Sequence, residues 1–201
     1  PQFRMIKRLT GGNAFIAVTH VGLAGNANNQ LFLNSNAAAG ASGSSQDPGS
    51  FTATNTFVGD GVAENNADDD YIMYLWAPIP NYSAFGSYQG NALSGGNGPF
   101  VYTGFRPAFV MIKCSSQGTA DVTNWFLQDS TREINNPCRD PLAANTTLPE
   151  YDFTSALVDI LSNGFKLRGG PDQMNGNHTY IYCAFAENPT GSSNTSPATA
   201  R

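Results

Sequence analysis

The sequence predicts an all-β protein that consists of two tandem β-sandwich domains related by internal duplication. Three observations predict this fold class: the sequence repeats itself, its apolar segments are short and bounded by Gly, Pro and Asn turns, and no stretch shows a sustained 3.6-residue period. Residues 1–7 return 106 positions later as residues 107–113, and residues 71–77 return 109 positions later as residues 180–186. Nearly equal offsets, longer than the roughly 20–50 residues of solenoid repeats, indicate two copies of one domain.

The repeat divides the chain into a first copy, residues 1–80, a second copy, residues 81–189, and an extended C-terminal tail, residues 190–201. The second copy has strand-like residues before Pro107, whereas the first copy begins at the matching Pro1, so we expect the first copy to be N-terminally incomplete or completed by further residues. We expect the first copy to borrow a strand, from an upstream segment or from another subunit, by addition at an open sheet edge.

The expected strands are short and β-prone, and about six or seven per copy would form a two-sheet, jelly-roll-like sandwich. Asn163-Gly164 predicts a hairpin. The closing strands, which begin at Tyr71 and Tyr180, are the most apolar, so we expect them to be central in their sheets. The expected strands cover residues 3–7, 14–18, 30–34, 51–54 and 71–77 in the first copy and residues 109–113, 124–128, 140–144, 158–161, 165–167 and 180–186 in the second.

Composition limits the partners. The net charge is −5 and the basic residues are scattered, which argues against a nucleic-acid partner. No apolar run approaches the roughly 18 residues of a membrane span. The three cysteines, Cys114, Cys138 and Cys183, cannot all pair, and their spacing fits no zinc site. We therefore expect no cofactor or metal, and three small buried thiols.

Two stretches of the second copy carry a resemblance to a known family. The first stretch comprises residues 85–91 (FGSYQGN) and 98–113 (GPFVYTGFRPAFVMIK). The second comprises residues 161–167 (LSNGFKL) and 179–189 (TYIYCAFAENP). Both stretches resemble a virion-protein domain of tailed phages of marine bacteria and cyanobacteria. That domain is found near the C-terminus of tail or appendage proteins. The resemblance covers residues 85–201, while residues 1–80 follow the pattern more loosely. It implies a virion location and a lectin-like β-sandwich, and supplies no catalytic or binding residues.

The expected function is that of a non-enzymatic structural protein on the virion surface, in a tail fibre or a capsid-surface appendage. Its expected partners are other copies of itself and other virion proteins, with a trimer as the first expectation by analogy to phage fibres. The alternative is a host-surface glycan-binding module. Tyr82, Tyr88 and Tyr151 are its candidate stacking residues because polar residues or prolines flank them. Tyr102 is a further aromatic candidate, and Trp76 and Trp125 are expected in the core.

A polysaccharide depolymerase is the less favoured third interpretation, because it needs paired carboxylates. The first copy has only Asp47 between Pro1 and Gly59, which favours a scaffold. The candidate acids of the second copy are Asp129, Glu133, Asp140, Glu150, Asp152 and Asp159.

Two further groups could carry chemistry. His20 and His178 are not at equivalent positions and no nucleophile motif accompanies them, so we expect exposed loop histidines. Asp68, Asp69 and Asp70, with Glu64, could offer oxygen ligands to Ca²⁺, but the spacing matches no known loop and a solvated acidic turn is expected.

Overall fold

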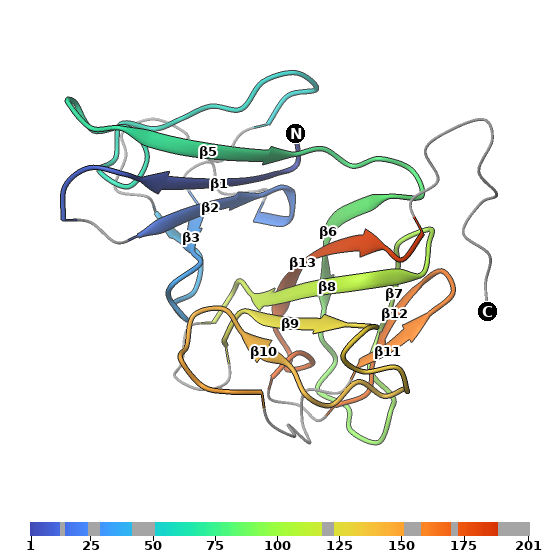
Figure 1. Ribbon diagram of the computed structural model, residues 1–201. Coiled ribbons are helices and arrows are strands. Elements are labelled where there is room, and N and C mark those ends of the chain that lie inside the picture. The colour runs from blue at the N-terminus through green and yellow to red at the C-terminus, as the bar shows by residue number, and fades with distance from the viewer. Residues whose placement is uncertain are drawn as a thin grey trace.

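The fold is all-β, as the sequence predicts. The computed structural model describes residues 1–12, 15–23, 29–41, 51–117, 123–150, 158–169 and 173–188. Its first sheet has the strand order β4-β3-β2-β1-β5 and is antiparallel throughout (Figure 1). The strands are β1 (Phe3–Arg8), β2 (Ile16–His20), β3 (Asn29–Phe32), β4 (Gly40–Ala41) and β5 (Tyr71–Trp76), with a 3₁₀ turn η1 (Val21–Leu23) after β2.

The remaining strands form two more sheets. The second sheet has the order β10-β9-β8-β13-β6, and the third has the order β11-β12-β7. The order β3-β2-β1-β5 of the first sheet recurs in the second as β10-β9-β8-β13. The strands are β6 (Ser83–Gln89), β7 (Phe100–Tyr102), β8 (Pro107–Cys114), β9 (Phe126–Asp129), β10 (Leu142–Ala143), β11 (Val158–Leu161), β12 (Gly164–Leu167) and β13 (Thr179–Ala186).

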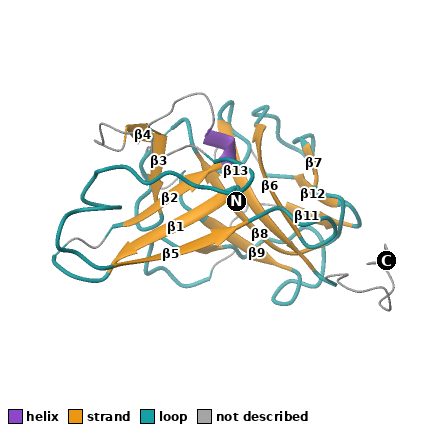
Figure 2. Cartoon of the chain, turned by 90° about the horizontal axis from the view of Figure 1, so that it is seen from above, coloured by secondary structure: helices purple, strands orange, loops and turns teal. Residues whose placement is uncertain are grey.

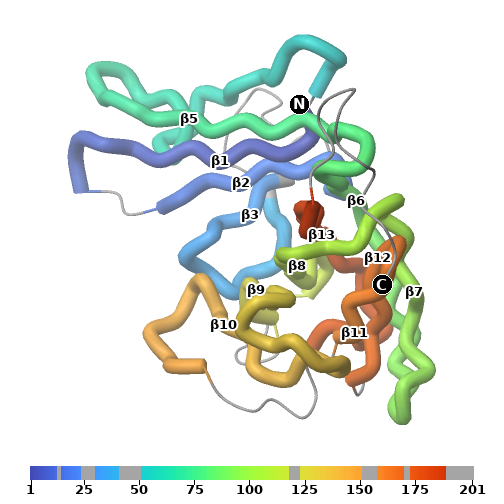
Figure 3. Tube along the Cα trace, turned by 45° about the vertical axis from the view of Figure 1, so that its right-hand side comes forward, coloured from blue at the N-terminus to red at the C-terminus, as the bar shows by residue number. Residues whose placement is uncertain are grey.

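The second sheet is the middle layer and is buried on both faces. Figure 3 shows the first sheet lying over β8 and β13, with β7, β11 and β12 on the other side of the middle sheet. Successive residues of a strand point to opposite faces. Along β13, Ile181 and Cys183 accordingly join the core against the first sheet, while Tyr180, Tyr182 and Ala184 join the core against the third.

The core between the first and second sheets is aromatic. Phe3 of β1 stacks on Phe85 of β6 with ring centroids 5.8 Å apart. Trp125, which precedes β9, is fully buried there, and its indole N–H donates to the Phe32 carbonyl oxygen at 2.9 Å. The sequence prediction of a core position for Trp125 is confirmed.

A buried ion pair covers the outer face of the first sheet. The Arg4 guanidinium on β1 contacts the Glu64 carboxylate at 3.1 Å, and both side chains are almost fully buried. Arg4 also donates to the Thr19 hydroxyl at 2.7 Å and to the Phe57 carbonyl oxygen. Gln30 of β3 donates to the same carboxylate. The segment between β4 and β5 is thus held against the sheet by polar contacts.

The structure corrects two expectations about strands. Residues 51–54 form no strand; Phe51 makes only an isolated bridge to Thr56. The closing strand β13 lies between β8 and β6, as expected, but β5 is an edge strand, so the expectation of a central position at Tyr71 is wrong. The Asn163-Gly164 hairpin is confirmed, with Leu161 opposite Gly164.

The expected division at residue 80 coincides with a change of sheet, because β1 to β5 form the first sheet and β6 to β13 form the others. The core that contains Phe3, Val18 and Trp125 nevertheless combines residues from both sides of that boundary. The division into two domains stays a prediction. The expected tail, residues 190–201, lies outside the described residues.

Candidate functional site

The three tyrosines predicted to bind a glycan do not form one site. Tyr82 is 40% exposed and its ring lies edge-on to Phe185, 6.1 Å away. Tyr88 is instead half-buried and packs against the core between the second and third sheets: it stacks on Tyr180 at 5.1 Å and donates to the Met174 carbonyl oxygen at 2.7 Å. Burial raises its pKa well above the usual value. Tyr151 lies outside the described residues.

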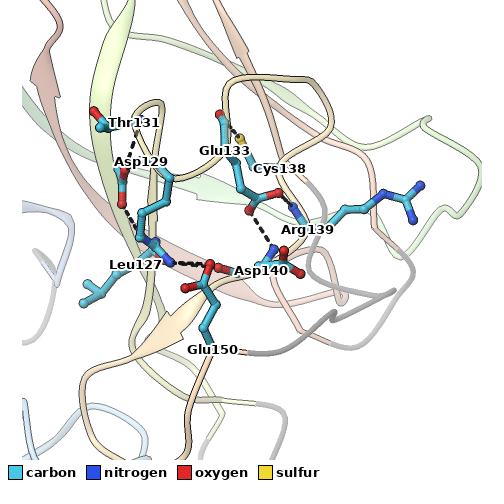
Figure 4. Close-up of polar contacts among 9 residues, drawn as sticks. Leu127, Asp129, Thr131, Glu133, Cys138, Arg139, Asp140 and Glu150 are labelled. Atoms are coloured by element: carbon cyan, nitrogen blue, oxygen red, sulfur yellow. Dashed lines mark hydrogen bonds and ion pairs between the residues drawn. The ribbon is translucent and has the colours of Figure 1, made fainter.

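Four of the predicted acidic residues gather around one arginine in the loop after β9 (Figure 4). Arg132 pairs with the Asp129 carboxylate and, at 3.1 Å, with that of Glu150. It also donates to the Asp140 carbonyl oxygen at 3.0 Å. Glu133 accepts the backbone N–H groups of Arg139 and Asp140, the latter at 2.6 Å. The carboxylates of Asp129, Glu133 and Glu150 thus have donors from their own segment.

This arrangement stabilises the loop and differs from a glycosidase pair, which needs one carboxyl group with a raised pKa. Burial alone would raise the pKa of Asp129, but the backbone N–H and guanidinium of Arg132 lower it below its usual value. Asp159 lies on β11, in the third sheet, and pairs with Arg168. Asp152 lies outside the described residues.

The acidic turn before β5 is tied to β1. The Asp69 carboxylate contacts the Arg8 guanidinium at 2.6 Å and accepts the Thr10 hydroxyl at 2.9 Å. Hydrogen bonds from Asn66 and Arg8 lower the pKa of Asp69. Glu64 pairs with Arg4 instead of joining Asp69. Among the described residues, no cluster of three or more His, Cys, Asp or Glu side chains could hold a metal ion.

The histidine expectation is wrong for His20. It ends β2 and is buried between the first two sheets, where its Nδ1 accepts the Gly22 N–H and its Nε2–H donates to the Tyr182 carbonyl oxygen, both at 2.9 Å. Burial lowers its pKa to about 4. His178 is half-buried in the segment before β13. The two histidines lie on different elements, with no pairing between them among the described contacts.

Lys113 is a buried residue that sequence reasoning missed. Its ammonium group donates to the carbonyl oxygens of Cys114 at 2.7 Å and Asn36 at 3.2 Å. Burial lowers its pKa to about 8. These contacts, together with the Ala39 N–H that donates to the Ser115 carbonyl oxygen at 2.8 Å, hold the segment after β3 on the end of β8. The three cysteines are free and buried, as predicted.

The most unusual surface is the edge strand β5, whose four central residues are apolar and exposed in succession. Tyr74 is 51% and Leu75 48% exposed, whereas their counterparts on β13, Cys183 and Ala184, are 1% and 0% exposed. Ile72 and Met73 are also exposed. Figure 2 shows β5 at the border of its sheet, beside β1. Residues 71–76 carry no charge, proline or glycine, the features that usually protect an edge strand.

The backbone of β5 also has hydrogen-bonding groups at this border. Two residues that flank β1 donate to carbonyl oxygens at the ends of its pairing with β5: the Leu9 N–H donates to the Asp70 carbonyl oxygen and the Gln2 N–H donates to the Trp76 carbonyl oxygen, both at 2.8 Å. Alternate residues of an antiparallel strand direct their N–H and C=O to the same neighbour. Tyr71, Met73 and Leu75 therefore direct theirs away from β1, and no described strand pairs with them. We call residues 71–76, with this free side, the β5 edge.

The apolar pattern of residues 71–76 is visible in the sequence, but the sequence does not show that this strand is exposed at an edge. Residues 71–77 have the same apolar pattern as residues 180–186, so both predict a buried strand. The second copy has residues that form β6 on the far side of β13, and β5 has no such neighbour among the described strands.

Comparison with known proteins gives a family. Residues 1–189 match the family described as Domain of unknown function (DUF7483), and the chain belongs to this family. The matched region includes all strands of the first sheet and of the second sheet. No curated protein and no solved structure matches the chain. Among the described residues, no helix has the length and hydrophobicity needed to cross a membrane.

Proposed function

We propose that this chain is a non-enzymatic structural protein of a tailed-phage particle, exposed on the virion surface and contacting neighbouring virion subunits through the β5 edge. The observation that carries the assembly role is the contrast between two equivalent strands. β13 is covered by β6, while β5 presents four exposed apolar side chains and a row of backbone groups that no described strand pairs with. Such an edge accepts a further strand. The location in a phage particle comes from the sequence resemblance.

We also propose that the first two sheets arose by duplication, and strand register supports this. Met5 lies opposite Val18 and Tyr74, and the equivalent Met111 lies opposite the residues 109 positions after these, Leu127 and Cys183. Register is set independently by each strand pair, and a shift of one residue would reverse the face of every side chain. Agreement in both pairs is therefore unexpected for unrelated sheets.

Side-chain hydrogen bonds support the duplication further. The Asn34 side-chain oxygen accepts the Ile16 N–H at 3.2 Å, and the equivalent Asn145 oxygen accepts the Trp125 N–H at 2.9 Å. In the turn that follows each asparagine, a Ser or Thr hydroxyl accepts the N–H two residues later. These details recur although the aligned residues differ in most positions.

The location is tested by mass spectrometry and immunogold electron microscopy of purified particles that encode the chain. The protein is expected in stoichiometric amounts at one defined surface site. Its absence from particles that are otherwise complete would refute the proposal. Release of reducing sugar from host polysaccharide that Asp129→Asn abolishes would refute the non-enzymatic role.

A glycan-binding role is the second candidate, and exposed aromatics on β7 favour it. Phe100 and Tyr102 are two residues apart, so they share one face of the strand, and they are 45% and 67% exposed. Aromatic faces of this kind stack on sugar rings. A glycan array that gives signals lost in Tyr102→Ala, and kept in Tyr88→Phe, would support this role; a blank array would leave the structural role alone.

A further inference from the structure

We propose that the β5 edge binds an extended peptide strand with the residue pattern of β6, laid antiparallel to β5 in the register that β6 has on β13. This inference rests on the structural role proposed above, because it names the chemistry of the neighbour at the same edge. The occupant is an uncharged strand donated to β5, in which two aromatic residues three positions apart stand among small and polar residues, as in β6.

The register follows from the equivalence of β5 and β13. On β13 the groups that face β6 belong to even-numbered residues, since the His178 carbonyl oxygen accepts the Gly90 N–H at 2.9 Å and the Ala186 N–H donates to Tyr82 at 2.8 Å. Tyr182 lies opposite Gly86 in this ladder. Its counterpart is Met73, which directs its backbone groups to the free side of β5. The donated strand therefore places its Gly86-like residue opposite Met73.

The side chains of the occupant follow from the same equivalence. Phe85 lies opposite Cys183 and reaches the core between the first two sheets. The corresponding aromatic residue would lie opposite Tyr74 and reach the ring pair of Tyr74 and Trp76, whose centroids are 6.1 Å apart. On β6 itself a Cβ at Gly86 would come within 2.9 Å of the Tyr182 hydroxyl, and β5 has Met73 in place of that tyrosine. Pairing would cover the four exposed apolar residues of β5.

The flanking charges fit an uncharged or basic donor. Asp68, Asp69 and Asp70 precede β5, and only Asp69 has an arginine partner among the described ion pairs. The other long edge strand, β6, carries Ser83, Ser87 and Gln89 and lacks a comparable apolar run. A strand of the β6 type thus has one matching acceptor edge among the long described edges, that of β5.

The test uses the whole chain and a fluorescent peptide with the sequence of residues 82–90. Binding is followed by fluorescence anisotropy, and the contact is located by amide hydrogen exchange. We expect saturable binding, with new protection at the amides of Tyr71, Met73 and Leu75 and little change at Ile72 and Tyr74, which already pair with β1. A peptide that merely exchanges with β6 would leave these amides unprotected and would overturn the proposal.

Matched variants distinguish backbone strand pairing from nonspecific hydrophobic binding. A Gly86→Pro peptide loses an N–H that faces the partner strand, and we expect binding to weaken roughly tenfold, whereas Ser87→Pro loses an N–H that faces away and should bind nearly as well. In the protein, Met73→Pro should weaken binding similarly, with Ile134→Lys, another exposed apolar position, as the control. Leu75→Lys replaces Met73→Pro if circular dichroism shows that the latter is unfolded.

Three results would overturn the proposal: no binding up to about 1 mM peptide, equal binding by the two proline peptides, or a concentration-dependent dimer that Leu75→Lys abolishes in the absence of peptide binding. The last result would assign the edge to a second copy. A trimer in which the β5 amides stay unprotected would place the subunit contact elsewhere. These outcomes are independent of the particle location, because a chain absent from particles could still bind the strand and a virion protein could fail to bind it.

Discussion

Acidification should destabilise the packing of the first sheet on the second through His20. This side chain lies edge-on to the stacked rings of Phe3 and Phe85, and its two nitrogens are occupied by the Gly22 N–H and the Tyr182 carbonyl oxygen. Nδ1 accepts a hydrogen bond, so a second ring proton would face a donor. Burial lowers the folded-state pKa from 6.5 to about 4. The folded protein therefore keeps His20 neutral where the unfolded chain takes up a proton.

The sign and size follow from linkage. Above pH 6.5 both states are neutral and His20 adds no pH dependence. As the pH falls from 6.5 toward about 4, only the unfolded state binds the proton, so stability is lost. One pKa unit corresponds to about 1.4 kcal/mol. At pH 4.5 most of this difference in proton binding between the two states is present, so the expected loss relative to pH 7 is roughly 2–3 kcal/mol.

The assay is urea unfolding followed by tryptophan fluorescence at pH 7.0 and pH 4.5. His20→Gln keeps a polar side chain without a titrating ring, so its loss of stability between the two pH values should be roughly 2–3 kcal/mol smaller than that of the native chain. His178→Gln is the matched control and should behave like the native chain. Equal pH dependence of the native chain and His20→Gln would refute the reasoning, because carboxyl groups would then account for all of it.

Three further predictions concern the core. Glu64→Gln leaves the buried Arg4 charge without its carboxylate and should lower the free energy of unfolding in urea by about 3–5 kcal/mol. The double variant Arg4→Met/Glu64→Leu should lower it by less than that single change. A larger loss in the double variant would contradict this prediction. Gly22→Ala should lower stability by about 1–3 kcal/mol, because a Cβ would come within 2.9 Å of a side-chain carbon on β6 and 3.1 Å of a backbone oxygen. Gly12→Ala, with nothing within 4 Å, is its neutral control by thermal unfolding. Burial raises the pKa of Cys138 to about 12, so iodoacetamide at pH 8 should alkylate this thiol only after denaturation; alkylation of the native chain would show that it is accessible.

Much of the strand map could be predicted from the sequence. The apolar segments that follow Gln2 and Pro107 became β1 and β8, and the segment at Tyr180 became the central strand β13. These predictions hold because a short, continuous apolar run between turn residues has few alternatives to a buried strand. The expected strand at residues 51–54 failed. Phe51, Thr52, Ala53 and Thr54 alternate apolar and polar side chains, but the segment has no partner strand in the described sheets and turns back on itself through the Thr52 N–H, which donates to the Asn55 carbonyl oxygen.

Site predictions depended more on neighbours than on residue type. Tyr88 was expected at the surface because its flanking residues are Ser87 and Gln89, yet β6 alternates, and Tyr88 faces the core while the flanking residues face outward. The sequence offered six candidate acids without saying which of them lie together. Asp159 lies on β11, and which donors the carboxylates near Arg132 have depended on the path of the loop.

The sequence by itself determined the all-β class of the fold and the strands that pair locally, because these depend on alternation and turn residues within a few positions. Only the tertiary structure decided that His20 is buried and that β5 is exposed. Burial is a property of the sheet that packs against a strand and of the strand beside it, and these come from residues far along the chain. The similar apolar patterns that begin at Tyr71 and Tyr180 therefore give an edge without a described neighbour in one place and a largely buried central strand in the other.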